Sequence, residues 1–301
     1  MTLHEGEITI GEAGVRQLLE QQCPQWAALP LTPAGAGTEN TMYRLGETLL
    51  VRLPRTTEKA GALRKETRWL PRLADRLPLR IPSPVYAGSP AGSYPADWAV
   101  FTWIDGAEAG PDTVGDWAAF GTDLAGFVRE LHRIELGAVR QGGDLSWYRG
   151  GELRPCDAWV TRDLAASRPL IGDEQVDGLE EIWRAGLALP SPDRPHVWLH
   201  GDLKPTNLLV KDGRLTAVID FGALSVGLPD AEHATIWDLP AGAREAYRKE
   251  LDLDEVTWRR ARAWAVAVAV SGIAYYWSTF PSFVAECRAR VANLLASPER
   301  L

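Results

Sequence analysis

The sequence predicts an α+β chain in two parts: a five-stranded antiparallel sheet with one helix in residues 1–103, and a mostly helical part in residues 104–301. Two observations support the division. Short apolar runs broken by Gly and Pro fill the first part, whereas apolar residues recur at helical spacing in the second. A third observation, one compact β segment at 197–221 among the later helices, predicts a hairpin inside the helical part.

The first part begins with a short helix and then alternates strands with turns. The helix is expected at 11–22 and is ended by Pro24. Five apolar runs are interpreted as strands, at 31–37, 41–45, 48–53, 85–87 and 98–104. A second helix, the one carried by the sheet, is expected at 58–77, where leucines recur on one face.

The second part is read as six helices, at 113–134, 157–168, 173–189, 242–250, 254–278 and 282–296. Thr113 and Asp116 match a capping box at the start of the first of these. The uncharged run 263–280 lies at the lower limit of a membrane span of roughly 17–25 residues. Because the run contains Ser, Gly and Thr, we interpret it as part of a buried helix.

Composition narrows the class of protein. A chain of 301 residues with 46% hydrophobic and 24% charged residues is an ordinary globular mixture. A net charge of −8 argues against nucleic acid as a partner. Cys23, Cys156 and Cys287 form neither a disulfide framework nor a zinc spacing. The acidic start does not resemble a signal peptide, so we expect a cytoplasmic protein with no membrane contact and no obligatory protein partner.

The β segment contains a two-residue hairpin signal, Asp212-Gly213. Counting outward from this turn brings Asn207 and Asp220 to one end of the hairpin. Asp202, on the loop that enters the hairpin, is expected at the same end. Two carboxylates and a carboxamide are hard oxygen donors, and such a set suits Mg²⁺.

These three residues are also what phosphoryl transfer requires. Asp202 would take the proton of an attacking hydroxyl, while Asn207 and Asp220 would hold the metal. The alternative is that Asp202 and Asn207 are loop residues that make only turn hydrogen bonds.

The motif His200-Gly201-Asp202-x4-Asn207, followed by Asp220-Phe221-Gly222, resembles the catalytic and metal loops of the kinase-like fold. More narrowly, it resembles the aminoglycoside/macrolide phosphotransferase family of small-molecule kinases. Protein kinases usually carry Arg where this chain has Gly201, and no Ala-Pro-Glu motif follows. The resemblance implies a bilobal protein-kinase-like fold. It also implies transfer of the γ-phosphoryl group of ATP or GTP to a hydroxyl of an antibiotic, aminoglycoside or macrolide-like, or of a related metabolite.

The resemblance further implies a nucleotide site in the first part. The Gly-rich turn at 35–40, with Thr38 and Asn40, lies where the family places its phosphate-covering loop, although alone it is a plain hairpin loop. Residues Thr102 to Ile104 would present backbone groups to the purine. Lys204 would reach the γ-phosphate or remain a solvated loop residue.

Arg52 occupies the position where kinases keep Lys. Glu66 lies on the apolar face of its predicted helix, where a carboxylate is costly unless it is paired. We therefore expect an ion pair between Arg52 and Glu66, like the Lys–Glu pair of kinases. Arg is not a conservative replacement for Lys, because its fork can bind phosphate through two hydrogen bonds.

The segment after the metal motif departs from the family pattern. Leu228 and Glu232 replace two aspartates, and Asp230 is additional. Glu232 either braces the catalytic loop with a longer arm or, together with Asp230, faces a cationic substrate. Arg149 and Asp157 are further candidate contacts to the acceptor, which is expected to be a small hydroxylated molecule.

Other functions remain open on the sequence alone. Arg52, Leu228 and Glu232 would also suit a non-catalytic nucleotide-binding module. A kinase of a primary metabolite, such as a sugar or an amino alcohol, fits the motifs equally well. A protein kinase fits less well, since Gly201 breaks the regulatory pattern.

Overall fold

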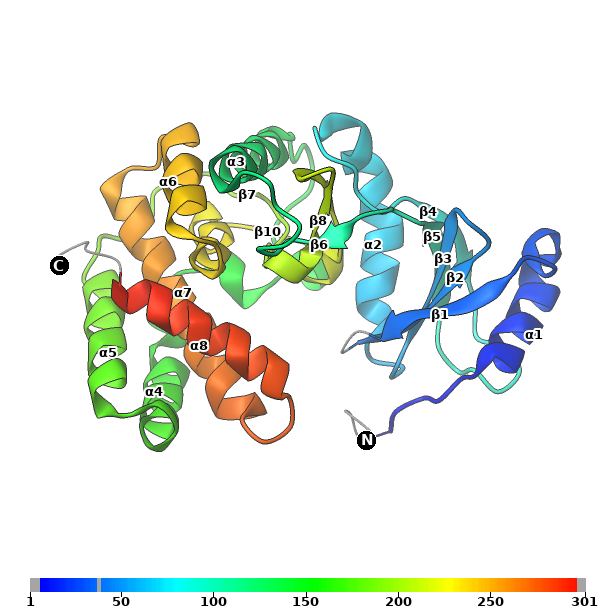
Figure 1. Cartoon of the computed structure of the whole chain (residues 1–301), viewed down its shortest axis with the longest axis horizontal. Coiled ribbons are helices and arrows are strands. Elements are labelled where there is room, and N and C mark those ends of the chain that lie inside the picture. The colour runs from blue at the N-terminus through cyan, green and yellow to red at the C-terminus, as the bar shows by residue number, and fades with distance from the viewer. Residues whose placement is uncertain (1–5, 37–38, 297–301) are drawn as a thin grey trace. The chain divides into compact units, whose positions relative to one another are not determined.

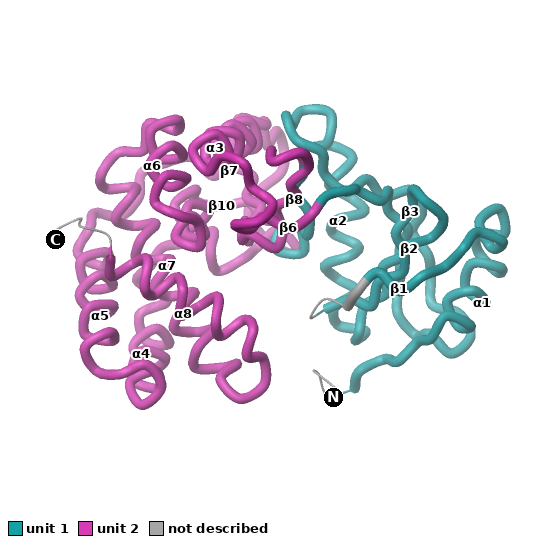
Figure 2. Tube along the Cα trace, viewed as in Figure 1, with its two compact units in different colours: residues 1–106, 217–224 teal, residues 107–216, 225–301 magenta. Residues whose placement is uncertain are grey.

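The computed structural model of the chain describes residues 6–36 and 39–296. It divides into two compact units (Figure 1, Figure 2). The N-terminal unit contains residues 1–106 together with 217–224, and the C-terminal unit contains residues 107–216 and 225–301. The segment that carries Asp220 therefore belongs to the N-terminal unit, although it lies far along the chain.

The N-terminal unit is built on a five-stranded sheet in the order β1-β2-β3-β5-β4. Every neighbouring pair is antiparallel, which confirms the predicted sheet. The strands are β1 (Leu31–Ala36), β2 (Asn40–Leu45), β3 (Leu49–Pro54), β4 (Pro84–Gly88) and β5 (Trp98–Thr102).

The two helices of this unit are α1 (Glu12–Gln22) and α2 (Ala60–Leu73). Side chains alternate along a strand, so Val51 and Leu53 share one face of β3 and Arg52 lies on the other. Val51 and Leu53 are buried in a cluster with apolar residues of α1. Helix α2 packs on β4 and β5, and the Arg52 guanidinium lies 5.2 Å from the ring centre of Phe101 in β5. The alternation therefore turns Arg52 toward the α2 side of the sheet.

The C-terminal unit is mostly helical, as predicted, with α7 buried along most of its length. Helix α7 packs against α4, α5 and α8. The helices of the C-terminal unit are α3 (Trp117–Arg133), α4 (Asp157–Ile171), α5 (Asp173–Leu187), α6 (Ala241–Glu250), α7 (Glu255–Tyr276) and α8 (Pro281–Ala296). Within the described ranges, no helix combines the length and apolarity that a membrane span requires.

The expected hairpin is present as β8 (Leu208–Lys211) and β9 (Arg214–Val218) in a sheet ordered β6-β8-β9. Its turn residues Asp212 and Gly213 have φ values of 52° and 77°, as a tight two-residue turn requires. The sequence did not indicate three short elements, β6 (Ala107–Glu108), β10 (Ser225–Gly227) and the 3₁₀ helix η8 (Pro229–Asp238). Strand β10 pairs antiparallel with β7 (Val197–Leu199).

The prediction of a capping box at Thr113 and Asp116 is wrong. Helix α3 begins at Trp117, and Asp116 is its N-cap, accepting hydrogen bonds from the N–H groups of Ala118 and Ala119. The Thr113 hydroxyl is already used, because it donates to the Glu108 carbonyl at 2.8 Å and accepts from the Gly110 N–H at 2.9 Å. One residue therefore caps α3 where two were expected.

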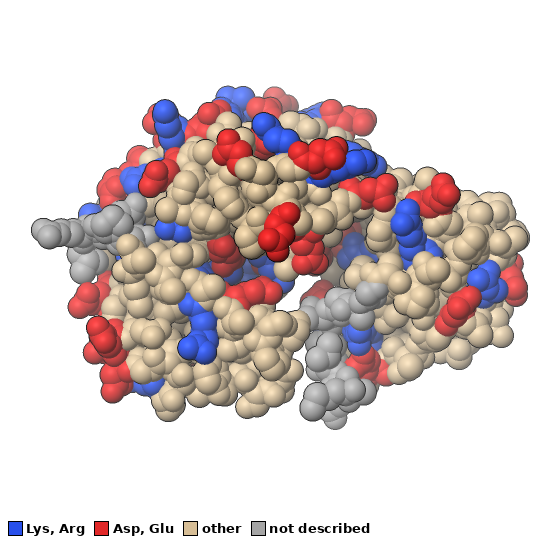
Figure 3. Space-filling view, in the orientation of Figure 1, with Lys and Arg blue, Asp and Glu red and all other residues tan. Residues whose placement is uncertain are grey.

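Charged side chains of both signs are interspersed on the face drawn in Figure 3. Many exposed charges are paired along helices, as Arg259 is with Glu255 one turn away. An exposed pair contributes at most about 1 kcal/mol. The fold therefore depends on its buried core, where a small residue can allow two helices to approach closely.

Such a close approach joins α3 to α6 at Gly121. A Cβ atom at Gly121 would lie 2.2 Å from the Ala243 carbonyl oxygen, whereas a Cβ at Gly126 of the same helix would meet nothing within 4 Å.

Gly121→Ala should therefore destabilise the protein, and Gly126→Ala should stabilise it. Overpacking of a fixed backbone costs about 1–3 kcal/mol, while Ala in place of a helical Gly contributes up to about 1 kcal/mol. Urea unfolding of the two variants measures both changes. Equal effects at the two positions would contradict the close contact between α3 and α6.

Candidate active site

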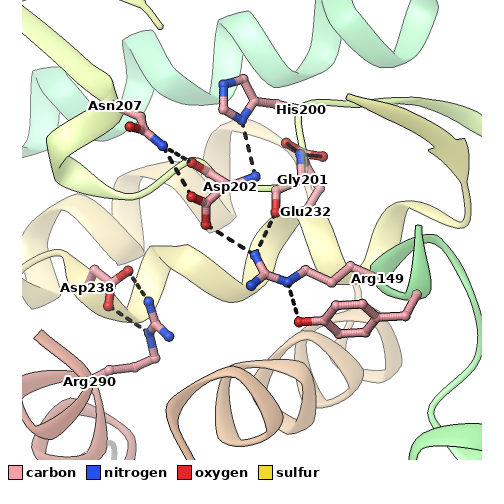
Figure 4. Close-up of polar contacts among 9 residues, drawn as sticks. Arg149, His200, Gly201, Asp202, Asn207, Glu232, Asp238 and Arg290 are labelled. Carbon is pink, nitrogen blue, oxygen red and sulfur yellow. Dashed lines mark hydrogen bonds and ion pairs between the residues drawn. The ribbon is translucent and has the colours of Figure 1, made fainter. Parts of the chain in front are cut away.

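The candidate catalytic loop, residues 200–207, joins β7 to β8 and is tied by internal hydrogen bonds (Figure 4). Asn207 Nδ2 donates to the Asp202 carbonyl oxygen at 2.8 Å and to its carboxylate Oδ2 at 3.3 Å. The Asp202 N–H donates to His200 Nδ1 at 3.1 Å. Gly201 has a φ of 83°, a backbone angle that residues other than glycine rarely adopt. The loop geometry therefore requires both the glycine and the carboxamide of the motif.

Asp202 combines partial exposure with a cationic neighbour. Its side chain is 31% exposed, and Arg149 Nη1 donates to its Oδ1 at 3.1 Å. The same Nη1 donates to the Gly201 carbonyl at 2.7 Å. Burial alone would raise the pKa of Asp202, but the Arg149 charge, helped by Lys204, outweighs burial and lowers the pKa below its ordinary value. Asp202 is therefore ionised at neutral pH.

Glu232, on η8, braces this loop from behind. It is 3% exposed, and its Oε2 and Oε1 accept from the Gly201 N–H at 3.2 and 3.4 Å. Burial raises the pKa of Glu232 to about 8, although backbone N–H groups of the loop act in the opposite direction. These contacts favour the bracing role over contact with a cationic substrate.

The other acidic candidates are also held by internal contacts. Asp230 is 1% exposed and accepts from Arg260 Nη1 at 2.9 Å. Asp157, the first residue of α4, accepts from Trp183 Nε1 at 2.8 Å. Neither carboxylate is left without a donor.

In the N-terminal unit, Arg52 and Glu66 form the predicted ion pair. Arg52 Nη1 donates to Glu66 Oε2 at 2.6 Å, with side chains 8% and 0% exposed. Burial raises the pKa of Glu66 even beside the Arg52 charge. Among the described residues, Glu66 Oε1 has no hydrogen-bond partner. The pair is thus real but leaves one carboxylate oxygen unsatisfied.

Arg52 also reaches toward Asp220, which belongs to the same unit. Arg52 Nη2 lies 3.9 Å from Asp220 Oδ1. Burial alone would lower the pKa of Arg52, but the charges of Glu66 and Asp220 raise it. One planar guanidinium therefore faces two carboxylates, which a lysine ammonium could not do with the same geometry.

The two predicted Mg²⁺ ligands offer suitable oxygens, each within its own unit. Asp220 has a φ of 62°, unusual outside glycine, and its side chain is 54% exposed. Asn207 uses Nδ2 toward Asp202, and no described residue donates to its Oδ1. Carboxylate and amide oxygens fit Mg²⁺. The described part of the chain has no group of three or more His, Cys, Asp or Glu side chains suited to a metal, so this pair remains a prediction.

The residues predicted to contact the nucleotide differ in whether their polar groups are already used in the fold. Thr38 lies outside the described residues. Asn40 is the first residue of β2 and pairs opposite Pro54. The Thr102 N–H donates to the Ser83 carbonyl at 2.9 Å, so it is not available to a purine. Within the described ranges, neither backbone group of Ile104 is hydrogen-bonded, as a purine-binding backbone requires.

The Lys204 ammonium lies near an aromatic ring of α8. It lies 5.3 Å from the ring centre of Phe283, and it forms no ion pair with any residue that the structure describes. Its position remains compatible with either predicted role, a phosphate contact or a solvated loop residue.

Two arginine contacts beside the loop were not predicted from the sequence. Arg290 binds Asp238 through two hydrogen bonds of 2.7 and 2.6 Å (Figure 4), and Arg149 binds Asp202. The partners lie 52 and 53 positions apart. Local spacing contains no signal for contacts of this kind, since only the tertiary fold brings them together.

Breaking the buried pair with Arg52→Met should destabilise the protein by about 3–5 kcal/mol, because a buried carboxylate is left without its cation. The double variant Arg52→Met/Glu66→Leu should regain most of that loss, since no buried charge remains. Urea unfolding measures both free energies.

The control is Arg133→Met, which breaks an exposed pair with Glu130, 67% and 41% exposed. It should change stability by less than about 1 kcal/mol. If the double variant is as unstable as Arg52→Met, the unpaired charge is not the cause.

Glu232 should make the protein less stable as pH rises. Its ordinary pKa is 4.5 and burial raises it to about 8, so between these values the folded chain keeps a proton that the unfolded chain has lost. This contribution is complete below pH 4.5 and is lost as pH rises through about 8. In Glu232→Gln there is no proton to lose. Thermal unfolding from about pH 5 to about pH 8 should show the Tm of this variant rising relative to wild type; a constant difference would contradict the shift.

Comparison with known proteins agrees with the motif. The model of the phosphotransferase enzyme family matches residues 30–264. The curated proteins contain no match to this chain.

Several solved structures share the fold at low sequence identity. Wild-type aminoglycoside 2'-phosphotransferase-IIIa, in complex with GDP, is 18% identical over 95% of this chain and 99% of that chain, with a TM-score of 0.74. ADP-bound aminoglycoside phosphotransferase APH(2'')-Ib is 18% identical over 95% and 99%, with a TM-score of 0.64. Macrolide 2'-phosphotransferase MphH from Brachybacterium faecium is 21% identical over 96% and 99%, with a TM-score of 0.60. These likenesses confirm the expected kinase-like fold.

The family match includes both the loop around Asp202 and the segment around Asp220. It also covers the strand that carries Arg52 and the helix that carries Glu66. The chain therefore belongs to the phosphotransferase enzyme family.

Proposed function

We propose that this chain is a small-molecule kinase that transfers the γ-phosphoryl group of ATP or GTP to a hydroxyl group, with Asp202 as the base. One observation carries the proposal. The Asp202 side chain is 31% exposed, and each carboxylate oxygen accepts from a different donor, Oδ1 from Arg149 and Oδ2 from Asn207. A carboxylate held in this way keeps its orientation and retains lone pairs for an incoming hydroxyl.

In the proposed reaction, the acceptor hydroxyl donates its proton to Asp202 while its oxygen forms a bond to the γ-phosphorus. The bond between that phosphorus and the β–γ bridging oxygen breaks, and its electron pair leaves with the nucleoside diphosphate. The transition state of such transfers is loose, so positioning the hydroxyl matters more than strong basicity. A base whose pKa is lowered by Arg149 is compatible with this requirement.

Asn207 and Asp220 are the residues we propose to hold Mg²⁺, because both present oxygen atoms. When bound, Mg²⁺ neutralises charge on the phosphate oxygens. We further propose that Lys204 contacts the γ-phosphate and that the Ile104 backbone contacts the purine. Arg52 is proposed to serve the nucleotide site through its fork, in the place of the kinase lysine.

The acceptor is proposed to be an antibiotic, aminoglycoside or macrolide-like, or a related metabolite. Structures of the same fold include a complex with GDP and kanamycin and a macrolide 2'-phosphotransferase. A polycation requires free carboxylates, yet Asp230, Glu232 and Asp157 all have internal donors. Trp147 and Tyr148, next to Arg149 in the chain, are each 39% exposed. These observations favour an acceptor with a neutral or apolar face.

The test is a mass-spectrometric screen with Mg²⁺, ATP or GTP, and a panel of kanamycin, erythromycin, sugars and amino alcohols. Wild type should add one phosphoryl group to a panel member, with a higher kcat/KM for erythromycin than for kanamycin. Asp202→Asn should lower kcat by ~10²–10⁴-fold, the usual contribution of a positioned base, and should retain nucleotide affinity.

Asp212→Asn is the matched control, because it makes the same substitution at the exposed turn of the same hairpin. It should transfer phosphate as wild type does. Undiminished transfer by Asp202→Asn would overturn the role of Asp202. Mg²⁺-dependent nucleotide binding without transfer to any acceptor would instead indicate a non-catalytic nucleotide-binding module.

A further inference from the structure

We propose that Arg149 is a positioning residue for phosphoryl transfer: it fixes the carboxylate of Asp202 and the backbone of Gly201 as one unit. This inference rests on the proposed function of Asp202 as the base. It replaces the expectation that Arg149 contacts the acceptor, and it assigns the residue a role inside the catalytic loop.

The contacts of the guanidinium support this role. Arg149 Nη1 donates both to the Gly201 carbonyl at 2.7 Å and to Asp202 Oδ1 at 3.1 Å. Arg149 Nε donates to the Tyr148 hydroxyl at 3.0 Å, which fixes the plane of the guanidinium. The side chain of Arg149 is 14% exposed. A planar group held on two sides restricts rotation of the Asp202 side chain relative to its own backbone.

The backbone that carries Arg149 is itself fixed. Arg149 lies in the 3₁₀ turn η4 (Tyr148–Gly150). The Gly150 carbonyl accepts from the Leu228 N–H at 2.9 Å and from Gln141 Nε2 at 3.2 Å. A Cβ atom at Gly227 would lie 2.4 Å from the Gly150 carbonyl oxygen, so the two backbones can touch only because residue 227 is glycine. The turn therefore packs directly on β10, and it cannot shift without breaking this contact.

Other charged groups act on Asp202 from further away. Lys204 and His200 belong to its own loop, Arg290 and Glu286 to α8, and Glu232 to η8. Among the charged side chains of the described ranges, Arg149 is the one that donates a hydrogen bond to the carboxylate. The remaining donor to the carboxylate, Asn207, binds the other oxygen. Loss of Arg149 would leave Oδ1 free and the carboxylate held on one side.

The test compares Arg149→Met, Arg149→Lys and Arg149→Ala with wild type, using ATP and Mg²⁺ with kanamycin and erythromycin as acceptor probes. Arg149→Met should lower kcat by ~10–100-fold, as a misplacement of about 1 Å does, with KM for ATP and acceptor within about twofold of wild type. Arg149→Lys should give an intermediate kcat, since one ammonium cannot reproduce the planar fork. Millimolar methylguanidine should restore part of the kcat of Arg149→Ala, which a general loss of structure would not allow.

Arg140→Met is the matched control. Arg140 belongs to the same interhelical segment, and its hydrogen bonds to described residues are those to the carbonyl groups of Gly137 and Val139. It should leave kcat unchanged. Thermal unfolding of each variant separates a folding defect from a catalytic one, and Arg149→Lys tests the role if Arg149→Met does not fold.

Three results would overturn the proposal while wild type remains active. These are an unchanged kcat in Arg149→Met, a raised acceptor KM with normal kcat, or no rescue of Arg149→Ala by methylguanidine. The second of these would restore the acceptor-contact role. A wild-type enzyme that transfers no phosphate would instead refute the proposed function, and the role of Arg149 with it.

Discussion

Burial alone would favour the protonated form of Asp202, and the guanidinium of Arg149 reverses that preference. Much of the surrounding structure is needed to keep this contact in place. Gly150 and Gly227 allow the turn that carries Arg149 to touch β10, and Glu232 binds the N–H of the residue before Asp202. The loop is thus held through its backbone on one side and through its carboxylate on the other. Because each support comes from a different element, the fold holds the Asp202 carboxylate more firmly than the loop sequence could alone.

The N-terminal unit also pairs a carboxylate with an arginine, but there the arginine is shared by two carboxylates. Glu66 is fully buried and shares Arg52 with Asp220, whose carboxylate is more than half exposed. A forked guanidinium can face two carboxylates at once, which a single ammonium could not do with the same geometry. The compromise is that Glu66 Oε1 has no hydrogen bond among the described residues. Glu66 thus holds one nitrogen of the guanidinium, Nη1, while the other, Nη2, lies 3.9 Å from Asp220 Oδ1.

Local features of this fold were predictable, whereas long-range contacts were not. The turn at Asp212 and Gly213 follows from two residues that tolerate positive φ, and the Arg52–Glu66 pair follows from a carboxylate on an apolar helix face. The contact between Arg149 and Asp202 joins residues 53 positions apart, and no local pattern contains it. The helix cap shows the same limit at short range, since Thr113 fitted the capping pattern but its hydroxyl was already bonded to Glu108 and Gly110.

The segment after Asp220 shows the same balance of charge. Asp202, Asp230 and Asp238 each have an arginine partner, Arg149, Arg260 and Arg290 respectively. Leu228 is 8% exposed, so an aspartate there would be a further buried charge, which is destabilising without its own donor. Arg149 precedes Gly150, whose carbonyl accepts a hydrogen bond from the Leu228 N–H. The Arg149 guanidinium already donates to Asp202. Leu228 therefore adds no carboxylate that would need a donor, and Glu232 takes its donor from the backbone, the Gly201 N–H.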